Sequence, residues 1–255
     1  MQLTKMNLPN YRAAVCLNNY GTSLLERGRV QEAATLLRDS LAIMNTVLQA
    51  TGAGSAGMRP QGVSVSDKLH FATKCMAELP MRARARRPSI TPLVHVVRYD
   101  GEFASSVPPD ECLSIHHQYN VIKIEDFDNH QKEDEDGVRA CLDIHTAIIV
   151  HNSAMTRLAL SKLSNRKQRN TEMTQKVCVK LLRWAHAILS RAFDLCPRES
   201  TYLSVLVLGT LSTLLDRSGE QAEAGKVALA RQSLKDMVQT FERLVPSQPG
   251  VAAAA

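Results

Sequence analysis

Hydrophobic residues recur at helical spacing at both ends of the chain and lose that spacing in the middle. Near the N-terminus the spacing predicts two helices, over about residues 10–27 and 30–49, with Leu17, Tyr20 and Leu24 on one stripe of the first. From residue 137 onward it predicts four more helices, over about 138–163, 173–196, 199–216 and 222–244. The pattern therefore favours an all-α fold built from consecutive pairs of helices.

Short breaks separate the predicted helices. Gly28 allows a tight turn after the first helix, and Ser218-Gly219 divides the last pair. The polar residues 164–172 are expected to form a connector between the third and fourth helices. Pro197 is expected to stop the fourth helix, because proline cannot continue the hydrogen bonds of a helix.

The segment between the two helical regions, residues 51–136, differs in composition. It begins with glycines and serines, ends in the strongly acidic run 125–136, and predicts a long insertion, at least half of it disordered. Residues 68–79 are a candidate short helix. The stretches 93–99 and 119–125 alternate apolar and polar residues and are candidates for a short β-ribbon, which would be marginal on its own.

The stretch 14–47 carries the most specific signature of the chain. Six of its residues fit the two-helix tetratricopeptide (TPR) pattern: Leu17, Tyr20, Gly21, Leu24, Ala33 and Leu37. Gly21 has a physical reason, since a side chain there would push the two helices of the unit apart. Asn45 stands where the pattern has proline, so the exit turn lacks support from the sequence. The unit resembles a tetratricopeptide repeat, a module that builds grooves for other proteins.

Two weaker copies of the pattern follow in the C-terminal half. They keep its spacing at Val150, Ser153 and Ala154 and at Val205, Leu208 and Gly209. The resemblance implies an all-α TPR-like superhelix of about three helical pairs, in which the first helix of each pair lines a concave groove. The first pair then covers residues 10–50, the second and third cover 137–245, and 246–255 form a disordered tail.

The resemblance also places a set of residues at the groove: Asn18, Asn19, Thr22, Asn152, Leu203 and Leu206. Asn19 and Asn152 hold equivalent places, and an asparagine amide can bond both the N–H and the C=O of an extended ligand. The alternative is that both are solvated. The third unit has Val207 at the equivalent place, so the series of asparagines along the groove is incomplete. The neighbouring Leu203 and Leu206 indicate that this end of the groove is more apolar. The basic side chains that clamp a chaperone's C-terminal carboxylate are absent from these places, which argues against that ligand.

Composition changes this picture little. The 255 residues are 44% hydrophobic but only 4% aromatic, which favours close-packed helices, and the net charge is +6. Six cysteines are scattered without a C-x-x-C pair, and no secretory leader is recognisable. The longest apolar run, 205–215, is too short for a bilayer. We expect an intracellular protein, cytoplasmic or nuclear, without a membrane partner.

Two basic stretches suggest further partners. Residues 157–183 hold eight Lys and Arg against one acid, Glu172, and are either a solvated helix face or a surface for an acidic partner or a nucleic acid. Trp184 is the only aromatic residue available for stacking there, and it is expected to pack in the core. The cluster Arg82–Arg87 before Pro88 and Ser89 suits either a basophilic kinase, with Ser89 as phosphosite, or nuclear import.

No set of residues indicates catalysis, a cofactor or a metal. The nearest approach to a zinc site lacks any standard spacing: Cys112, His116, His117 and His130. His145 and His151 lie on one predicted helix with Asp143, but no activated serine or cysteine accompanies them.

The sequence therefore predicts a non-enzymatic scaffold or adaptor that binds a peptide or helix of a partner protein in the concave groove. The alternative is a helical-repeat protein that binds RNA or another nucleic acid through residues 157–183. An enzyme ranks third, because no combination of acid, base, nucleophile or metal ligands is recognisable.

Overall fold

The computed structural model describes residues 8–50, 94–99, 119–124, 135–163 and 168–244. Its helices are α1 (Leu8–Glu26), α2 (Val30–Ala50), α5 (Glu135–Leu163), α6 (Gln168–Ala192), α7 (Pro197–Arg217) and α8 (Gln221–Leu244). Two strands, β1 (Val94–Tyr99) and β2 (Tyr119–Ile124), pair antiparallel with Val94 opposite Ile124. The prediction of a predominantly helical fold is confirmed. The predicted insertion ends too late, since α5 begins at Glu135, inside its predicted range 51–136. The candidate helix 68–79, the rest of 51–134 apart from the two strands, and the tail lie outside the described residues.

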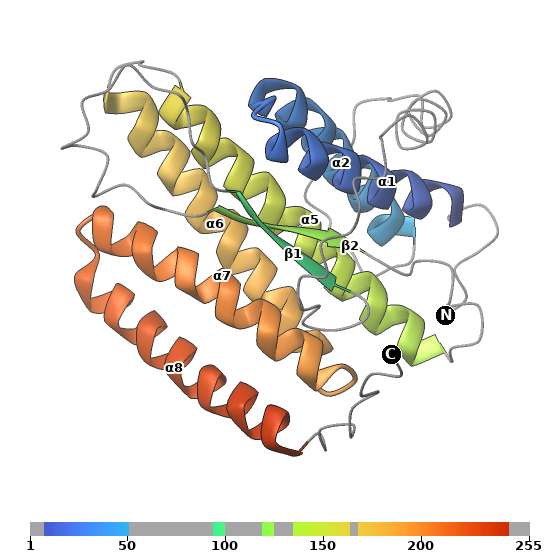
Figure 1. The fold of residues 1–255 in the computed structure, drawn as a ribbon, viewed down its shortest axis with the longest axis vertical. Coiled ribbons are helices and arrows are strands. Elements are labelled where there is room, and N and C mark those ends of the chain that lie inside the picture. Colours follow the sequence, from blue (N-terminus) through green and yellow to red (C-terminus); the bar gives the residue numbers. More distant parts are fainter. Residues whose placement is uncertain (1–7, 51–93, 100–118, 125–134, 164–167, 245–255) are drawn as a thin grey trace, which may run out of the picture.

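The helices follow one another in space in the order of the chain. Each packs against the next, so that α2 joins the first pair to α5, and α6 joins the second pair to α7 (Figure 1). The first helices of the pairs, α1, α5 and α7, also contact one another in turn. They therefore share one side of the row, and β2 lies on that side against α1 and α5.

The first and third pairs close with the same turn. Gly28 has a positive φ of 74°, and the N–H of Arg29 donates to the carbonyl oxygen of Leu24 at 3.0 Å. Gly219, with a φ of 81°, ends α7 in the same way. This is the left-handed helix ending that glycine adopts without steric cost. Both glycines thus hold the turns that the sequence assigned to them.

Gly21 sets the spacing of α1 and α2. A Cβ at this position would lie 2.9 Å from Cγ of Leu37 and 3.4 Å from the carbonyl oxygen of Ala33. The predicted physical reason for Gly21 is confirmed. The equivalent Gly209 differs, because the three atoms nearest to a Cβ there belong to the guanidinium group of Arg231, the far end of a flexible side chain whose Nε donates to the carbonyl oxygen of Val205.

The fourth predicted helix is misplaced at both ends. The helix α6 begins at Gln168, so part of the expected connector is helical, and it ends at Ala192 instead of Cys196. Polar residues such as glutamine and arginine form helices well, and a first turn needs no apolar face. Pro197 does not stop α6 but opens α7, where its fixed φ suits the first turn and its missing N–H has no partner to lose.

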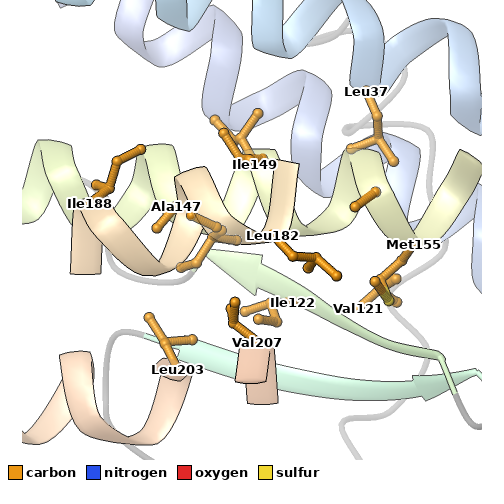
Figure 2. Packing of buried hydrophobic residues seen from close by; sticks show 14 of the residues in the cluster. Leu37, Val121, Ile122, Ala147, Ile149, Met155, Leu182, Ile188, Leu203 and Val207 are labelled. Atoms are coloured by element: carbon orange, nitrogen blue, oxygen red, sulfur yellow. The ribbon is translucent and has the colours of Figure 1, made fainter. Parts of the chain in front are cut away.

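One hydrophobic cluster runs through the row of helices and includes the strand. Leu37 of α2, Ile149 of α5, Leu182 of α6 and Val207 of α7 belong to it, together with Ile122 of β2 (Figure 2). A lone two-stranded ribbon is marginal in water. Here the ribbon is held because β2 is part of the core of the helical stack.

Candidate functional site

Two asparagines hold the backbone of β2. The N–H of Ile122 donates to Oδ1 of Asn152 at 2.9 Å, and Nδ2 of Asn152 donates to the carbonyl oxygen of Ile122 at 2.7 Å. Asn19 does the same to Ile124, accepting from its N–H at 2.9 Å and donating to its carbonyl oxygen at 2.7 Å. Each amide therefore replaces the hydrogen-bonding groups of a neighbouring strand.

The geometry of a strand explains why these two residues are bound. Ile122 and Ile124 are two positions apart, so their N–H and C=O groups point to the same edge of β2. The opposite edge faces β1, where Val121 lies across from Val97 and Lys123 across from His95. The asparagine side chains thus cover the edge that β1 leaves open.

Asn18 and Thr22 add further hydrogen bonds around Asn152 and the backbone of β2. Nδ2 of Asn18 donates to the carbonyl oxygen of Ile122 at 3.2 Å, and Oδ1 of Asn18 accepts from Nδ2 of Asn152 at 2.9 Å. The hydroxyl of Thr22 donates to the carbonyl oxygen of Asn18 at 2.8 Å. Asn18, Thr22 and Asn152 are 0% exposed. The expectation of solvated asparagines is therefore wrong for Asn152, while Asn19 is half-buried.

The described side chains of β2, those of residues 121–124, comprise three buried aliphatic groups and one charged group. Val121, Ile122 and Ile124 are at most 3% exposed. Lys123 lies at the edge of the site, where its Nζ pairs with Oε2 of Glu26 at 2.7 Å. Glu26 is the last residue of α1. An extended chain in this position thus presents aliphatic groups inward and a cation to Glu26.

The third pair of helices contributes an apolar end. Leu203 is buried, Leu206 is half-buried and packs against the core, and Val207 is buried. Val207 belongs to the same hydrophobic cluster as Ile122 (Figure 2). Of the six predicted groove residues, the structure brings Asn18, Asn19, Thr22 and Asn152 together around one strand, with the leucines contributing to the hydrophobic cluster.

The docking of β2 against α1 and α5 is what sequence reasoning missed. The alternation of 119–125 predicts a strand, and the spacing of Asn19 and Asn152 predicts a site for extended backbone. Their combination was not foreseen, nor was the ion pair between Glu26 and Lys123. No local signal could have joined them, because Ile122 is 30 residues from Asn152 and 104 from Asn18 along the chain.

The basic stretch 157–183 is partly neutralised. Lys176 pairs with Glu172 at 2.6 Å, which raises the pKa of Lys176 and lowers that of Glu172, and Arg183 pairs with Glu223. Burial lowers the pKa of Lys162, and the nearby Arg217 acts in the same direction. The stretch is therefore less positive on the protein surface than the sequence suggests. The side chains of Arg166, Lys167 and Arg169 lie outside the described residues.

Trp184 does not pack in the core as expected and is 37% exposed. The buried face of α6 is a stripe at helical spacing that includes Cys178, Leu182, Ala185 and Leu189, and Trp184 falls beside it. Helical spacing therefore determines its position, and the size of the indole does not override it.

Two further pairs of polar side chains lie within the described helices. The hydroxyl of Tyr11 is hydrogen-bonded to Nδ1 of His145, and Asp143 pairs with Arg191 at 3.1 Å. Within the described residues, no three His, Cys, Asp or Glu come together as metal ligands would. The described helices also include none with the length and hydropathy of a membrane span. The zinc candidates at 112–130, Ser89 and the cluster Arg82–Arg87 lie outside this part of the chain.

Comparison with known proteins gives no match to a family model, to a curated protein or to a solved structure. The tetratricopeptide resemblance therefore depends on the residues at 14–47 and on the weaker copies that follow. What the resemblance implies about function is a proposal, which we develop from the contacts around β2.

Proposed function

We propose that the chain is a non-enzymatic adaptor of the tetratricopeptide type, which binds an extended peptide segment of a partner protein on the side lined by α1, α5 and α7. Its stack of helical pairs in chain order, with the first helices sharing one side, supports a TPR-like superhelix. A row of helices that share a side in this way offers a long surface to an extended ligand.

The main support for this function is the pair of amide contacts on β2. Asn19 and Asn152 each bond both backbone groups of one residue, and the two bound residues alternate along the strand. Backbone contacts of this kind give affinity for any extended segment, whereas pockets for alternate side chains give specificity. The site has the chemistry of a peptide receptor.

A peptide-binding assay on the full chain tests the function. A library of fluorescent ten-residue peptides is screened by anisotropy against a chain that carries Ile122→Ser and Ile124→Ser, so that β2 competes less for the site, once far-UV circular dichroism has verified that this chain is folded. Adding Asn19→Ala to it is expected to weaken each ligand of the site about 5- to 30-fold, since two hydrogen bonds of about 1 kcal/mol each are lost. Gln232→Ala is the matched control, because Gln232 bonds only Asp236 on the exposed face of α8. The adaptor proposal fails if no peptide binds, or if both variants bind every peptide equally.

A nucleic acid bound at 157–183 is the second candidate. It is favoured by the exposure of Trp184 one helical turn after Lys180, since an exposed indole and a cation together suit a stacked base. The pairing of Lys176 and Arg183 with acids counts against it. RNA affinity that falls steeply with salt and is lost in Trp184→Ala would favour this candidate over peptide binding.

A further inference from the structure

Backbone contacts alone give the groove no preference for any sequence, so specificity must come from the side chains that flank them. Ile122 and Ile124 carry the two bonded backbones, and their side chains are 0% and 3% exposed. A charged or polar group at either place would be buried without a partner, which costs several kcal/mol. Both places therefore select aliphatic side chains.

The position between these two aliphatic residues is different. Lys123 and Glu26 keep 26% and 32% of their side chains exposed, and their charged groups lie 2.7 Å apart. An exposed ion pair contributes little affinity, but a carboxylate in place of Lys123 would face Glu26 and be repelled. The end of α1 thus selects a cation at this position by excluding an acid.

We propose that the groove selects extended segments with a lysine or arginine between two aliphatic residues, and that residues 121–124 are its resident intramolecular ligand. This inference rests on the proposed peptide-binding function and names its ligand. The partner is a protein whose segment matches the pattern Val-Ile-Lys-Ile, and it binds by displacing β2.

The resident strand sets a threshold for such a partner. Only residues 125–134 separate β2 from α5, so β2 competes at a high effective concentration. A partner segment must therefore bind better than β2, or β2 must first be weakened. Lys123→Glu weakens the resident strand at a partly exposed position and leaves every group of the helices in place.

Two labelled peptides test the proposal. The first has the sequence of residues 117–126, and the second is identical except that it carries glutamate at the position of Lys123. Anisotropy is measured with the wild-type full chain, with Lys123→Glu and with Glu26→Lys, after far-UV circular dichroism has verified that each is folded. A peptide with serine at the two isoleucine positions serves as the negative control.

The lysine peptide is expected to bind Lys123→Glu about fivefold more tightly than the wild-type chain, and Glu26→Lys is expected to prefer the glutamate peptide by a similar factor. If the lysine peptide binds both chains equally and Glu26→Lys shows no inversion, the inference is overturned while peptide binding itself stands. If neither peptide binds any folded chain, the resident-ligand assignment fails, and the library screen decides the function separately.

A second copy of the chain is the alternative source of the strand. Dimers at working concentration that dissociate when the lysine peptide is added would overturn the intramolecular assignment. A monomer that gives the expected affinities supports it.

Discussion

Replacing Asn152 by aspartate isolates the amide contacts, because the two side chains have the same shape. The acceptor for the N–H of Ile122 is kept. The donor to the carbonyl oxygen of Ile122, at 2.7 Å, and to Oδ1 of Asn18, at 2.9 Å, is lost. A buried polar group left without its partner costs about 1–3 kcal/mol. Oδ1 of Asn18 is left without its donor, whereas the carbonyl oxygen of Ile122 keeps its bond from Nδ2 of Asn18. Because the new carboxylate is also fully buried, we expect Asn152→Asp to lower the free energy of unfolding by about 2–5 kcal/mol near neutral pH.

The penalty should depend on pH in a defined direction. Burial and the facing carbonyl oxygen disfavour the charged form, so the new carboxyl has a higher pKa in the folded than in the unfolded state. The neutral acid can donate its proton to Ile122, so this stabilisation is fully present below about pH 4, the unfolded pKa, and is lost as pH rises through the folded pKa. The penalty relative to wild type therefore shrinks on acidification.

Urea unfolding followed by circular dichroism measures this effect, with the wild-type chain at each pH as reference. Hydrogen exchange at the amides of Ile122 and Ile124 reports the strand itself. Asn19→Asp is the graded control, since Asn19 is half-buried and water can reach the new charge. A penalty below about 0.5 kcal/mol for Asn152→Asp, or one that is the same at both ends of the pH range, would refute the amide contacts described here.

Two further predictions concern packing. Gly21→Ala should destabilise the chain by about 1–3 kcal/mol in urea unfolding, because the added methyl meets Leu37, whereas Gly209→Ala should be neutral or stabilising; equal effects would contradict the close approach of α1 and α2. Cys178, whose pKa burial raises to about 12, should react with iodoacetamide only on global unfolding. Mass spectrometry should find the half-buried Cys196 alkylated before Cys178, and equal rates would show that Cys178 is accessible.

The helices were predictable because their evidence is local. Apolar residues at helical spacing, together with Gly28 and Gly219 at positive φ, place the hairpin turns correctly. The ends of α6 were not predictable to the residue, because a polar first turn and a proline are each compatible with more than one boundary. The exposure of Trp184 was not predicted either. Its large apolar side chain suggested burial, but its position beside the buried stripe of α6 leaves it partly exposed.

The sequence predicted the asparagines of the site but not the strand that they bond. Asn19 and Asn152 were identified because they hold equivalent positions in two units. Their capacity to bond an extended backbone follows from the donor and acceptor of an amide. Which backbone they bond depends on where β2 docks. Its Ile122 lies 30 residues before Asn152 and 104 residues after Asn18 in the chain. Local patterns cannot report pairings at that separation, so the strand and its groove had to be predicted as unrelated features.

The position of β2 connects the stability of the fold with its proposed use. Ile122 is part of the hydrophobic cluster, so a chain that loses β2 exposes aliphatic surface and removes the backbone groups that the buried amides of Asn18 and Asn152 bond on Ile122. Loss of β2 from its place against α1 and α5 is therefore unfavourable, and under the proposed function a partner segment must restore both the backbone contacts and the aliphatic contacts as it binds. This requirement explains why a matching pattern of side chains matters: a segment that satisfies only the asparagines would replace the hydrogen bonds of β2 without replacing its contribution to the core.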